Sequence, residues 1–303
     1  KKKLKKEKKQ LAYIVSDSNI PFWNIMSRGI KSKAQDLDYE VTVYSANNLL
    51  KTELENVIKS IKAKVDGIII SPISSSTAVT ILRLAESVNI PVVISDIGTD
   101  SGNYLSYISS DNFQGAYEIG KVLIKKMQEM QLENASVGII AIPQKRDNGK
   151  KRTAGFMKAL NEAGIKSSGL RQQVDFSYKE TYDHSLALIK EDPSLRALWL
   201  QGSNRYQGAL DAIADTGKKG EILLVCFDAE PEFMEMIPKS ILLGAAMQQP
   251  FLMGKKAVKV MDQHLKGKVV EKNIHLPILA ISTKNIQINR PLIERNVLGI
   301  DKH

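Results

Sequence analysis

Short polar side chains follow most of the apolar runs in this 303-residue chain. Their hydroxyl, amide and carboxylate groups can hydrogen-bond a polar ligand. They can equally cap the helices that come next, because serine and aspartate are preferred at helix N-caps. We interpret Ser71, Ser110 and Asp111 as caps or hinge residues and keep both readings open for the others. The polar groups are Ser16-Asp17-Ser18, Ser71-Pro72, Ser95-Asp96, Ser110-Asp111, Gln201-Gly202-Ser203, Phe227-Asp228 and Gln248-Gln249.

Two adjacent aromatic residues, Phe22 and Trp23, stand where a helix should begin, in the stretch SDSNIPFWNIM (16–26). Helix starts are usually polar. The two rings therefore either belong to the core or face something that is not protein.

The apolar runs themselves predict the elements that carry these groups. Continuous apolar runs separated by helical stretches predict a parallel sheet covered on both faces. The pattern restarts after Asp111, so the fold class is α/β with two doubly wound layers. Ligands of such sheets bind outside the carboxyl ends of the strands. The expected strands are 11–16, 41–44, 67–70, 91–95, 136–142, 171–174, 197–200, 222–227, 244–248 and 276–282.

Composition and charge exclude several classes of protein. No apolar run has the roughly 18 residues of a membrane span. No secretory signal is present, so we expect any export signal to have been removed or to precede Lys1. Of the net charge of +10, residues 1–10 contribute +6 through seven lysines and one glutamate. Such a run is typical of a solvated tail or of a segment near anionic lipid, and it lacks the arginines and aromatics of a base-reading surface. We expect no nucleic-acid binding.

The residues that could do covalent or metal chemistry show no useful spacing. Cys226 is alone in an apolar run, which indicates a buried, inert thiol. His184, His264, His275 and His303 are not spaced as metal ligands, and no phosphate-binding loop or nucleophile elbow appears. We therefore expect no enzyme activity, no metal and no cofactor.

Eight short motifs, in their order and separation, resemble the type I periplasmic binding proteins, nearest the ribose-binding branch. The resemblance extends from Leu11 to about Lys284. The motifs are PFW (21–23), NIPVVISD (89–96), YISSDNFQG (107–115), RTAGF (152–156), DF (175–176), QGAL (207–210), FDAEP (227–231) and QQP (248–250).

The resemblance implies two Rossmann-like lobes joined by three crossover strands, near Ser110–Asp111, Gln248–Gln249 and Pro277–Ile278. The domains would then be a basic tail (1–10), an N-terminal lobe (11–110 plus 249–277) and a C-terminal lobe (111–248 plus 278–303). The DNA-binding head of the related sugar-sensing repressors has no counterpart in the ten residues before Leu11.

The matched positions imply a set of ligand-binding residues. Phe22 and Trp23 match two aromatics that stack on a sugar ring, with core packing as the alternative, and Phe176 matches the aromatic that closes from the other lobe. Asp96, Arg152, Asp228 and Gln248 match positions that hydrogen-bond hydroxyls. Arg152 pairing with a surface carboxylate and Asp228 capping a helix are the alternatives. The full expected set is Asp17, Phe22, Trp23, Asp96, Ile97, Arg152, Phe176, Ser203, Asn204, Asp228 and Gln248.

Three positions depart from the ribose-binding pattern. Ile20 and Ile97 stand where that branch has an asparagine and an arginine, and Gly202 replaces an asparagine, with Ser203 and Asn204 beside it. These changes disfavour ribose and favour a less hydroxylated, differently shaped or partly apolar ligand, which leaves a deoxy or substituted sugar, a cyclised signalling molecule and a nucleoside-like compound open.

The function implied is that of an extracytoplasmic receptor, periplasmic or extracellular, that closes on a sugar-like ligand and delivers it to an ABC importer. The alternative is a sensor domain that reports the same kind of ligand to a membrane histidine kinase or chemoreceptor. The lysine-rich start and the residues after Lys284 favour that alternative. We expect a monomer, and a membrane anchor beside the lysine run is an open alternative.

Overall fold

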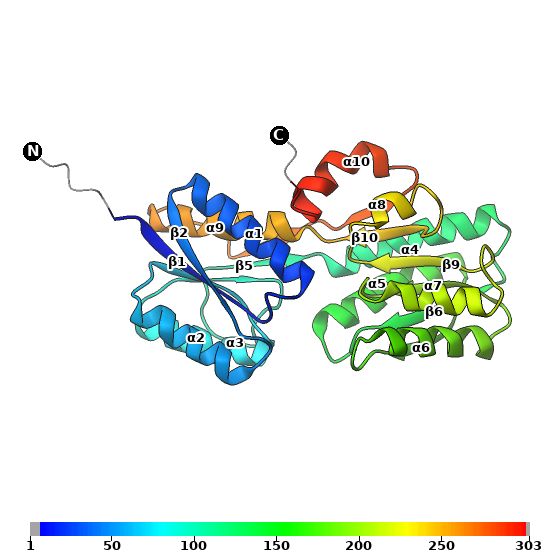
Figure 1. The fold of residues 1–303 in the computed structure, drawn as a ribbon, viewed down its shortest axis with the longest axis horizontal. Coiled ribbons are helices and arrows are strands. Elements are labelled where there is room, and N and C mark those ends of the chain that lie inside the picture. Colours follow the sequence, from blue (N-terminus) through cyan, green and yellow to red (C-terminus); the bar gives the residue numbers. More distant parts are fainter. Residues whose placement is uncertain (1–6, 301–303) are drawn as a thin grey trace, which may run out of the picture. The chain divides into compact units, whose positions relative to one another are not determined.

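The computed structural model of the protein describes residues 7–300. These residues divide into two compact units, each considered by itself. Unit 1 takes the chain up to Ser110, Gln249–Leu276 and the chain from Leu292 on, and unit 2 takes Asp111–Gln248 and Pro277–Pro291. Each unit is a parallel-dominated sheet with helices on both faces, so the predicted fold class is confirmed (Figure 1).

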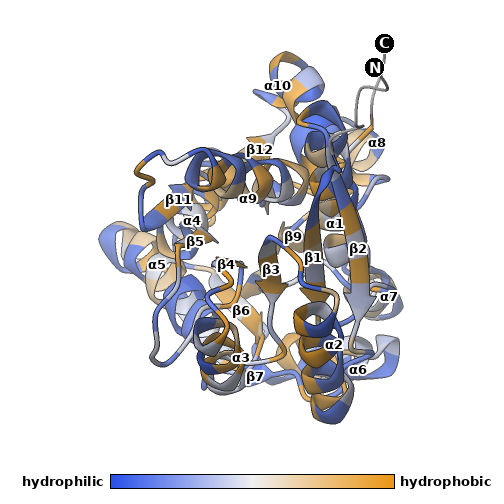
Figure 2. Ribbon diagram, turned by 90° about the vertical axis from the view of Figure 1, so that its left-hand side faces the viewer, coloured by the Kyte–Doolittle hydropathy of each residue, from blue (hydrophilic) through white to orange (hydrophobic). Residues whose placement is uncertain are grey.

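The sheet of unit 1 is parallel throughout, in the order β11-β5-β4-β3-β1-β2. Its central strands are buried on both faces, which is why they are continuous apolar runs. Figure 2 shows hydrophobic residues along β1 and β3. The strands are β1 (Lys9–Val15), β2 (Tyr39–Ser45), β3 (Gly67–Ser71), β4 (Val92–Ser95), β5 (Ser106–Ser110) and β11 (Asn273–Leu276).

Two pairs of helices cover this sheet. Helices α1 (Pro21–Asp36) and α9 (Pro250–Leu265) lie on one face, and α2 (Leu50–Lys62) and α3 (Ser75–Ser87) lie on the other (Figure 1). Both α1 and α9 begin with a proline, whose fixed φ suits the first helical turn. The pairs bury separate hydrophobic clusters against the two faces of the sheet.

The sheet of unit 2 has the order β12-β10-β9-β8-β6-β7 and is parallel except for β12, which is antiparallel to β10. Helices α4 and α5 cover one face and α6 and α7 the other (Figure 1). The strands are β6 (Ser136–Ala141), β7 (Lys166–Gln172), β8 (Leu195–Leu200), β9 (Leu223–Phe227), β10 (Gly244–Met247) and β12 (Leu279–Ser282). The helices are α4 (Asn112–Glu129), α5 (Asp147–Ala163), α6 (Tyr178–Glu191), α7 (Tyr206–Asp215), α8 (Phe233–Met236) and α10 (Ile286–Leu292).

Several expected boundaries differ from the structure. The single strand expected at 276–282 is two strands, because Pro277 separates β11 of unit 1 from β12 of unit 2. The strand expected at 171–174 is β7, which ends at Gln172. Strand β5 is not among the strands read from apolar runs, because SYISS is polar, and it was anticipated only as the crossover near Ser110–Asp111 that the resemblance implies.

The two ends of the chain also differ from the expected division. Lys9 and Gln10, expected in the basic tail, begin β1, while residues 1–6 of that tail and His303 lie outside the described residues. The segment from Leu292 on, expected with the C-terminal lobe, groups with unit 1. Between residues 7 and 300, no helix is both long and apolar enough to pass through a bilayer.

Glycines bring the paired helices of each unit into backbone contact. In unit 1, a Cβ added to Gly29 of α1 would collide with the carbonyl of Phe251 in α9, and one added to Gly254 would collide with that of Met26. In unit 2, a Cβ on Gly155 of α5 would collide with the carbonyl of Phe113 in α4. The close approach therefore depends on the missing side chains.

We predict that Gly155→Ala lowers the free energy of unfolding by about 1–3 kcal/mol, because α4 and α5 must move apart. Alanine is otherwise the better helix former, so an exposed site on the same helix should respond in the opposite direction or not at all. Urea denaturation of Gly155→Ala and of the exposed control Asn161→Ala measures this. Equal stability of the two variants would contradict the close packing.

Candidate functional site

The ends of β9 and β10 bring two of the expected residues together in unit 2. Ala246 of β10 pairs with Phe227 of β9, so Asp228 directly follows β9, and Gln248 follows β10 one residue later along the parallel strand. Asp228 donates its backbone N–H to the Ala246 carbonyl at 2.7 Å, and its Oδ1 accepts from Gln248 Nε2 at 2.5 Å. Asp228 has a φ of 73°, a left-handed conformation that aspartate tolerates better than most residues. The strand register therefore creates the Asp228–Gln248 pair.

The other end of the Gln248 amide has no partner. Gln248 is 4% exposed, and its Oε1 is buried without a hydrogen-bond donor among the described residues. An unsatisfied buried acceptor costs about 1–3 kcal/mol. A hydrogen-bond donor supplied by a bound molecule or a water would remove that cost, and the same holds for Trp199 Nε1 and Ser168 Oγ, whose partners would be an acceptor and either kind of group.

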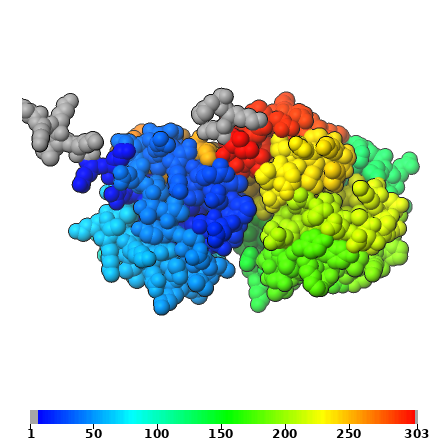
Figure 3. All heavy atoms as spheres, viewed as in Figure 1, coloured from blue at the N-terminus to red at the C-terminus, as the bar shows by residue number. Residues whose placement is uncertain are grey.

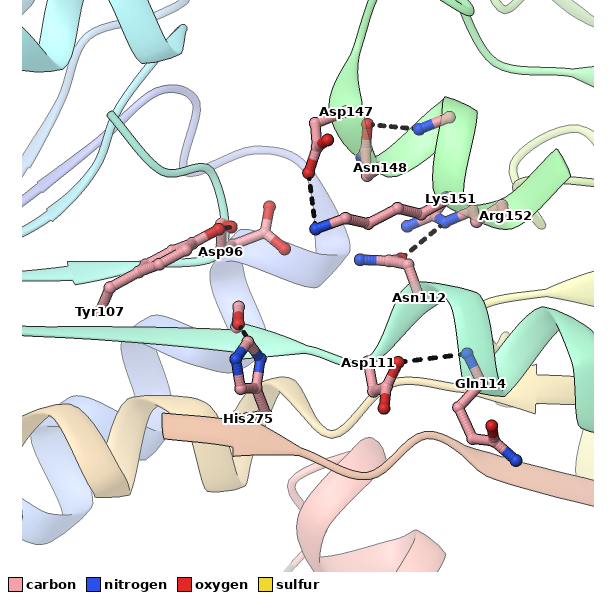
Figure 4. Close-up of polar contacts among 12 residues, drawn as sticks. Asp96, Tyr107, Asp111, Asn112, Gln114, Asp147, Asn148, Lys151, Arg152 and His275 are labelled. Atoms are coloured by element: carbon pink, nitrogen blue, oxygen red, sulfur yellow. Dashed lines mark hydrogen bonds and ion pairs between the residues drawn. The ribbon is translucent and has the colours of Figure 1, made fainter. Parts of the chain in front are cut away.

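Arg152 is the buried cation of unit 2, on α5 and only 5% exposed. Its Nε donates to Asn112 Oδ1 at 2.9 Å and its Nη1 to the Gln201 carbonyl at 2.8 Å (Figure 4 shows the contact with Asn112). Its guanidinium carbon lies 3.9 Å from the centre of the Phe227 ring. Arginine stays charged under all ordinary conditions, so this position presents a fixed cation at the ends of β8 and β9.

A buried glutamine supports the backbone that holds Arg152. Gln201 Oε1 accepts from the backbone N–H of Ile142 at 3.1 Å, and Gln201 Nε2 donates to Thr153 Oγ1 at 2.6 Å. Thr153 in turn donates to Gln144 Oε1 at 2.7 Å. Gln144, Thr153 and Asn112 were not in the expected set. Asn112 contacts Arg152 directly, while Thr153 and Gln144 hold Gln201, whose carbonyl Arg152 contacts. These contacts join residues of different elements, so a local sequence pattern does not predict them.

Ser203 and Asn204, expected together, have different environments. Ser203 is buried and donates to Glu230 Oε1 at 3.0 Å, whereas Asn204 is exposed. Burial raises the pKa of Glu230 above its usual range, and the bond from Ser203 opposes that rise. Glu230 joins the ends of β8 and β9 and was also absent from the expected set.

Phe176 lies in the loop between β7 and α6, half-buried and with a φ of 58°. Its backbone N–H donates to Glu180 Oε1 at 3.0 Å, and the other carboxylate oxygen of Glu180 accepts from Val174 and Asp175. Its ring centre lies 5.7 Å from the Arg146 guanidinium carbon. Glu180 therefore holds the loop in the shape that presents this ring.

In unit 1, Asp96 follows β4 with a φ of 76°. Its backbone N–H donates to the Ile108 carbonyl at 2.8 Å and its carbonyl accepts from Tyr107 Oη at 2.5 Å, so neighbouring β5 fixes its backbone (Figure 4 shows Asp96 beside Tyr107). Ile97 is half-buried and packs on the hydrophobic cluster beneath α1. Asp17, in the loop after β1, accepts from the backbone N–H of Asn19 at 3.0 Å.

The two aromatics at the start of α1 have unequal exposure. Trp23 is 8% exposed and belongs to the hydrophobic cluster of unit 1 that also holds Met26 and Met253. Phe22 is half-buried, packs against that cluster and meets Trp23 edge to face, with ring centres 5.0 Å apart. Trp23 therefore fits the alternative of core packing. Phe22 has the more exposed ring of the two and is the better candidate to contact a ligand.

The strand-end serines interpreted as caps or hinge residues also divide. Asp111 caps α4 by accepting from the Gln114 N–H at 3.1 Å, which confirms that interpretation. Ser71 instead turns inward, with its Oγ 2.7 Å from Tyr13 Oη, so it does not cap a helix, and its alternative interpretation as a hinge residue stays a prediction. Ser95 likewise points to Met26 Sδ at 3.2 Å.

One buried carboxylate in unit 1 was missed. Glu53 of α2 is buried and accepts from the backbone N–H of Ile73, after β3, at 2.8 Å. Burial raises its pKa, and the bond from Ile73 opposes the rise. Glu53 lies in an amphipathic helix, where a glutamate is usually exposed, so the sequence did not indicate that its carboxylate would be buried against Ile73.

Together these residues offer hydrogen bonds, one fixed cation and aromatic surface. Within residues 7–300, no group of three or more His, Cys, Asp or Glu side chains is arranged to hold a metal ion. Cys226 is fully buried, and burial raises its pKa, which disfavours the reactive thiolate. These groups can donate and accept hydrogen bonds and offer aromatic surface within their own units.

Relatives of known function share most of the chain. The ribose import binding protein of Bacillus subtilis is 27% identical over 264 residues, 87% of this chain and 84% of that protein. That of Haemophilus influenzae is 27% identical over 278 residues, 90% of this chain and 91% of that protein. The D-allose-binding periplasmic protein of Escherichia coli is 23% identical over 271 residues, 86% of each chain.

Solved structures share the fold. The periplasmic ribose ABC transporter protein of Conexibacter woesei has a TM-score of 0.84 at 20% identity and covers 96% of this chain and 98% of its own. A periplasmic solute-binding protein of Actinobacillus succinogenes with bound D-allose has a TM-score of 0.83 at 20% identity and covers 93% of this chain and 100% of its own.

A sequence model of the periplasmic binding protein domain matches residues 11–269, well over half of the chain. The two α/β units and the polar strand ends agree with that match. The chain belongs to the periplasmic binding protein family.

Proposed function

We propose that the protein is a periplasmic receptor that captures a sugar or sugar-like ligand and presents it to an ABC importer. The observation that carries the proposal is Gln248 Oε1, a buried acceptor without a donor, paired through the same amide with Asp228. A sugar hydroxyl is a suitable donor, and relatives of the chain are named as ribose and allose binding proteins. The protein is thus a binding protein and not an enzyme.

In this proposal, each unit supplies part of the binding surface. Unit 2 contributes Arg152, Asp228, Gln248, Ser203 and the Phe176 ring, with exposed Asn204 on the adjoining turn. Unit 1 contributes Asp96, Asp17 and Phe22, with Trp23 supporting Phe22 from the core. Closure of the units around the ligand is favoured only by interactions that the ligand makes with both of them.

The ligand we propose is less hydroxylated than ribose, or substituted. Ile97 is half-buried and Ile20 is exposed, and both are apolar where the ribose-binding branch is polar. Gly202 offers no side chain, and Ser203 beside it already donates to Glu230. Ile20, Ile97 and Gly202 have no side-chain hydrogen-bonding groups, so a ligand hydroxyl beside them would stay unsatisfied. A deoxy or alkylated sugar has fewer such hydroxyls and avoids that cost.

The receiving partner is proposed as a membrane permease. A sensor kinase or chemoreceptor is the second candidate, favoured by the segment after Lys284, part of which packs on unit 1. We propose a monomeric receptor in either case.

Isothermal titration calorimetry against a panel of pentoses, hexoses, deoxy sugars and nucleosides tests the proposed function. We expect one panel member to bind at one site per chain. The absence of binding across all the sugars would contradict the proposal, as would product formation from the ligand that binds.

We predict that Gln248→Leu lowers the affinity for that sugar by about 10- to 100-fold, because it removes the acceptor and the donor to Asp228. The free energy of unfolding without ligand should not fall, since the unsatisfied Oε1 is removed as well. The matched control is Gln207→Leu, which deletes an exposed amide that donates to Asp211 Oδ1 at 2.9 Å in α7. Equal affinities of the two variants would remove Gln248 from the site.

We predict different effects of truncating the two aromatics. Phe22→Ala should weaken sugar binding by about 2 kcal/mol, as loss of an anchoring ring does, with a small effect on stability. Trp23→Ala should lower the free energy of unfolding of the ligand-free protein by about 3 kcal/mol, because it leaves a cavity in the core. Calorimetric titration and thermal unfolding of both variants separate the effects. A Phe22→Ala variant with unchanged affinity would contradict the role of this ring.

A further inference from the structure

The chain passes between its two units four times, once more than the three crossovers of the family it resembles. The passages lie at Ser110/Asp111, Gln248/Gln249, Leu276/Pro277 and Pro291/Leu292. The first three connect the sheets, and the fourth brings the end of the chain back to unit 1. Ligand capture as proposed above gives this fourth passage no role.

The returning segment is well packed on unit 1. We define the C-terminal segment as residues 292–300. Ile293, Val297 and Leu298 are buried in it, and its helical part contacts α9. Figure 3 shows red atoms from the end of the chain beside blue atoms of unit 1. Burial of three large apolar side chains indicates stable docking.

Polar contacts fix the segment at a defined position. Arg28 of α1 donates from Nη1 to the Gly299 carbonyl at 2.7 Å and from Nη2 to the Leu298 carbonyl at 3.2 Å. Gly299 has a φ of 64°, and a Cβ there would lie 2.7 Å from Cδ2 of Phe251. Asn296 donates to Gln249 Oε1 at 3.1 Å, directly after the second passage. Helices α1 and α9 therefore recognise the backbone shape of the segment.

The residues before the segment are anchored in unit 2. Asn285 accepts from the Ser282 N–H at 2.9 Å and donates to the Ala280 carbonyl at 2.8 Å, both on β12. Ile286, the first residue of α10, is buried. The chain is thus held in unit 2 at Ile286 and in unit 1 at Ile293.

The short stretch between the anchors is irregular helix. Pro291 lies inside α10 and lacks the N–H that would continue its hydrogen-bond ladder. A π-helical turn, Ile293–Val297, follows immediately. Wide turns of this kind occur often at functional sites, and a helix interrupted by proline bends more readily than a regular one.

We propose that residues 292–300 form a latch, a docked segment that restricts movement of the two units. Arg28 holds the segment through its hydrogen bonds to the Leu298 and Gly299 carbonyls, and the chain bends at Pro291. Because both ends are anchored and no loop separates them, movement of one unit relative to the other must bend the chain at Pro291 or detach the segment from α1 and α9. The free energy of docking then sets how far the units move without ligand. This inference does not depend on the nature of the ligand.

Distance distributions between spin labels in the ligand-free protein, residues 1–303, test the latch. Labels at Arg83→Cys on α3 and Lys190→Cys on α6 report on units 1 and 2, and the native Cys226 is too buried to react. Val297→Asp places a charge at a position that is 3% exposed and should expel the segment, and Ile288→Asp makes the matched change where 83% is exposed.

We expect Val297→Asp to broaden the distance distribution, Arg28→Ala to broaden it less, and Ile288→Asp to leave it as in the wild type. Hydrogen exchange of the Leu298 and Ile300 amides, which donate to Ile293 and Glu294 carbonyls, reports whether the segment has detached. A detached segment with an unchanged distribution would overturn the latch. So would retained protection in Val297→Asp, since docking would then not depend on the buried side chain.

Discussion

The register of β9 against β10 is the constraint on which the candidate site depends. Strands β9 and β10 run side by side with Phe227 opposite Ala246, so Asp228 directly after β9 lies within reach of Gln248 directly after β10, one residue further along its strand. The backbone bond from Asp228 to Ala246 extends this pairing by one residue beyond the strand. The result is an amide whose donor end is satisfied within the protein and whose acceptor end is buried and open. In the function proposed above, a hydroxyl of the ligand would donate to this atom.

Rigid support surrounds this pair in unit 2. Arg152 lies on the Phe227 ring, directly before Asp228, and bonds the carbonyl of Gln201 at the end of β8. Gln201 is itself held by Ile142 and Thr153, so three strand ends and α5 belong to one network. Burying a cation costs free energy that only such contacts offset. In unit 1 the corresponding order comes from Tyr107, which fixes the backbone at Asp96.

The sequence predicted the architecture because continuous apolar strands and intervening helices leave few alternatives. The candidate residues could be placed at the strand ends because ligands of open α/β sheets bind outside the carboxyl ends of the strands. The direction of individual side chains was harder to predict. Ser71 and Ser95 turn toward Met26, and Trp23 packs in the hydrophobic cluster of unit 1. Hydroxyl and indole groups occur both in the protein interior and at ligand-binding surfaces, so the residue type alone does not decide between them. Glu230, Gln144 and Asn112 act through tertiary contacts, which no spacing along the chain reveals. The return of residues 292–300 to unit 1 likewise depends on Arg28, far away in sequence.

A crystal structure of the protein with its bound sugar tests the proposed site most directly. We expect a sugar hydroxyl within hydrogen-bond distance of Gln248 Oε1, with further contacts to Arg152 and Asp228 of unit 2 and to Asp96 of unit 1. A sugar bound to one unit alone, or bound with Gln248 Oε1 still unpaired, would contradict it.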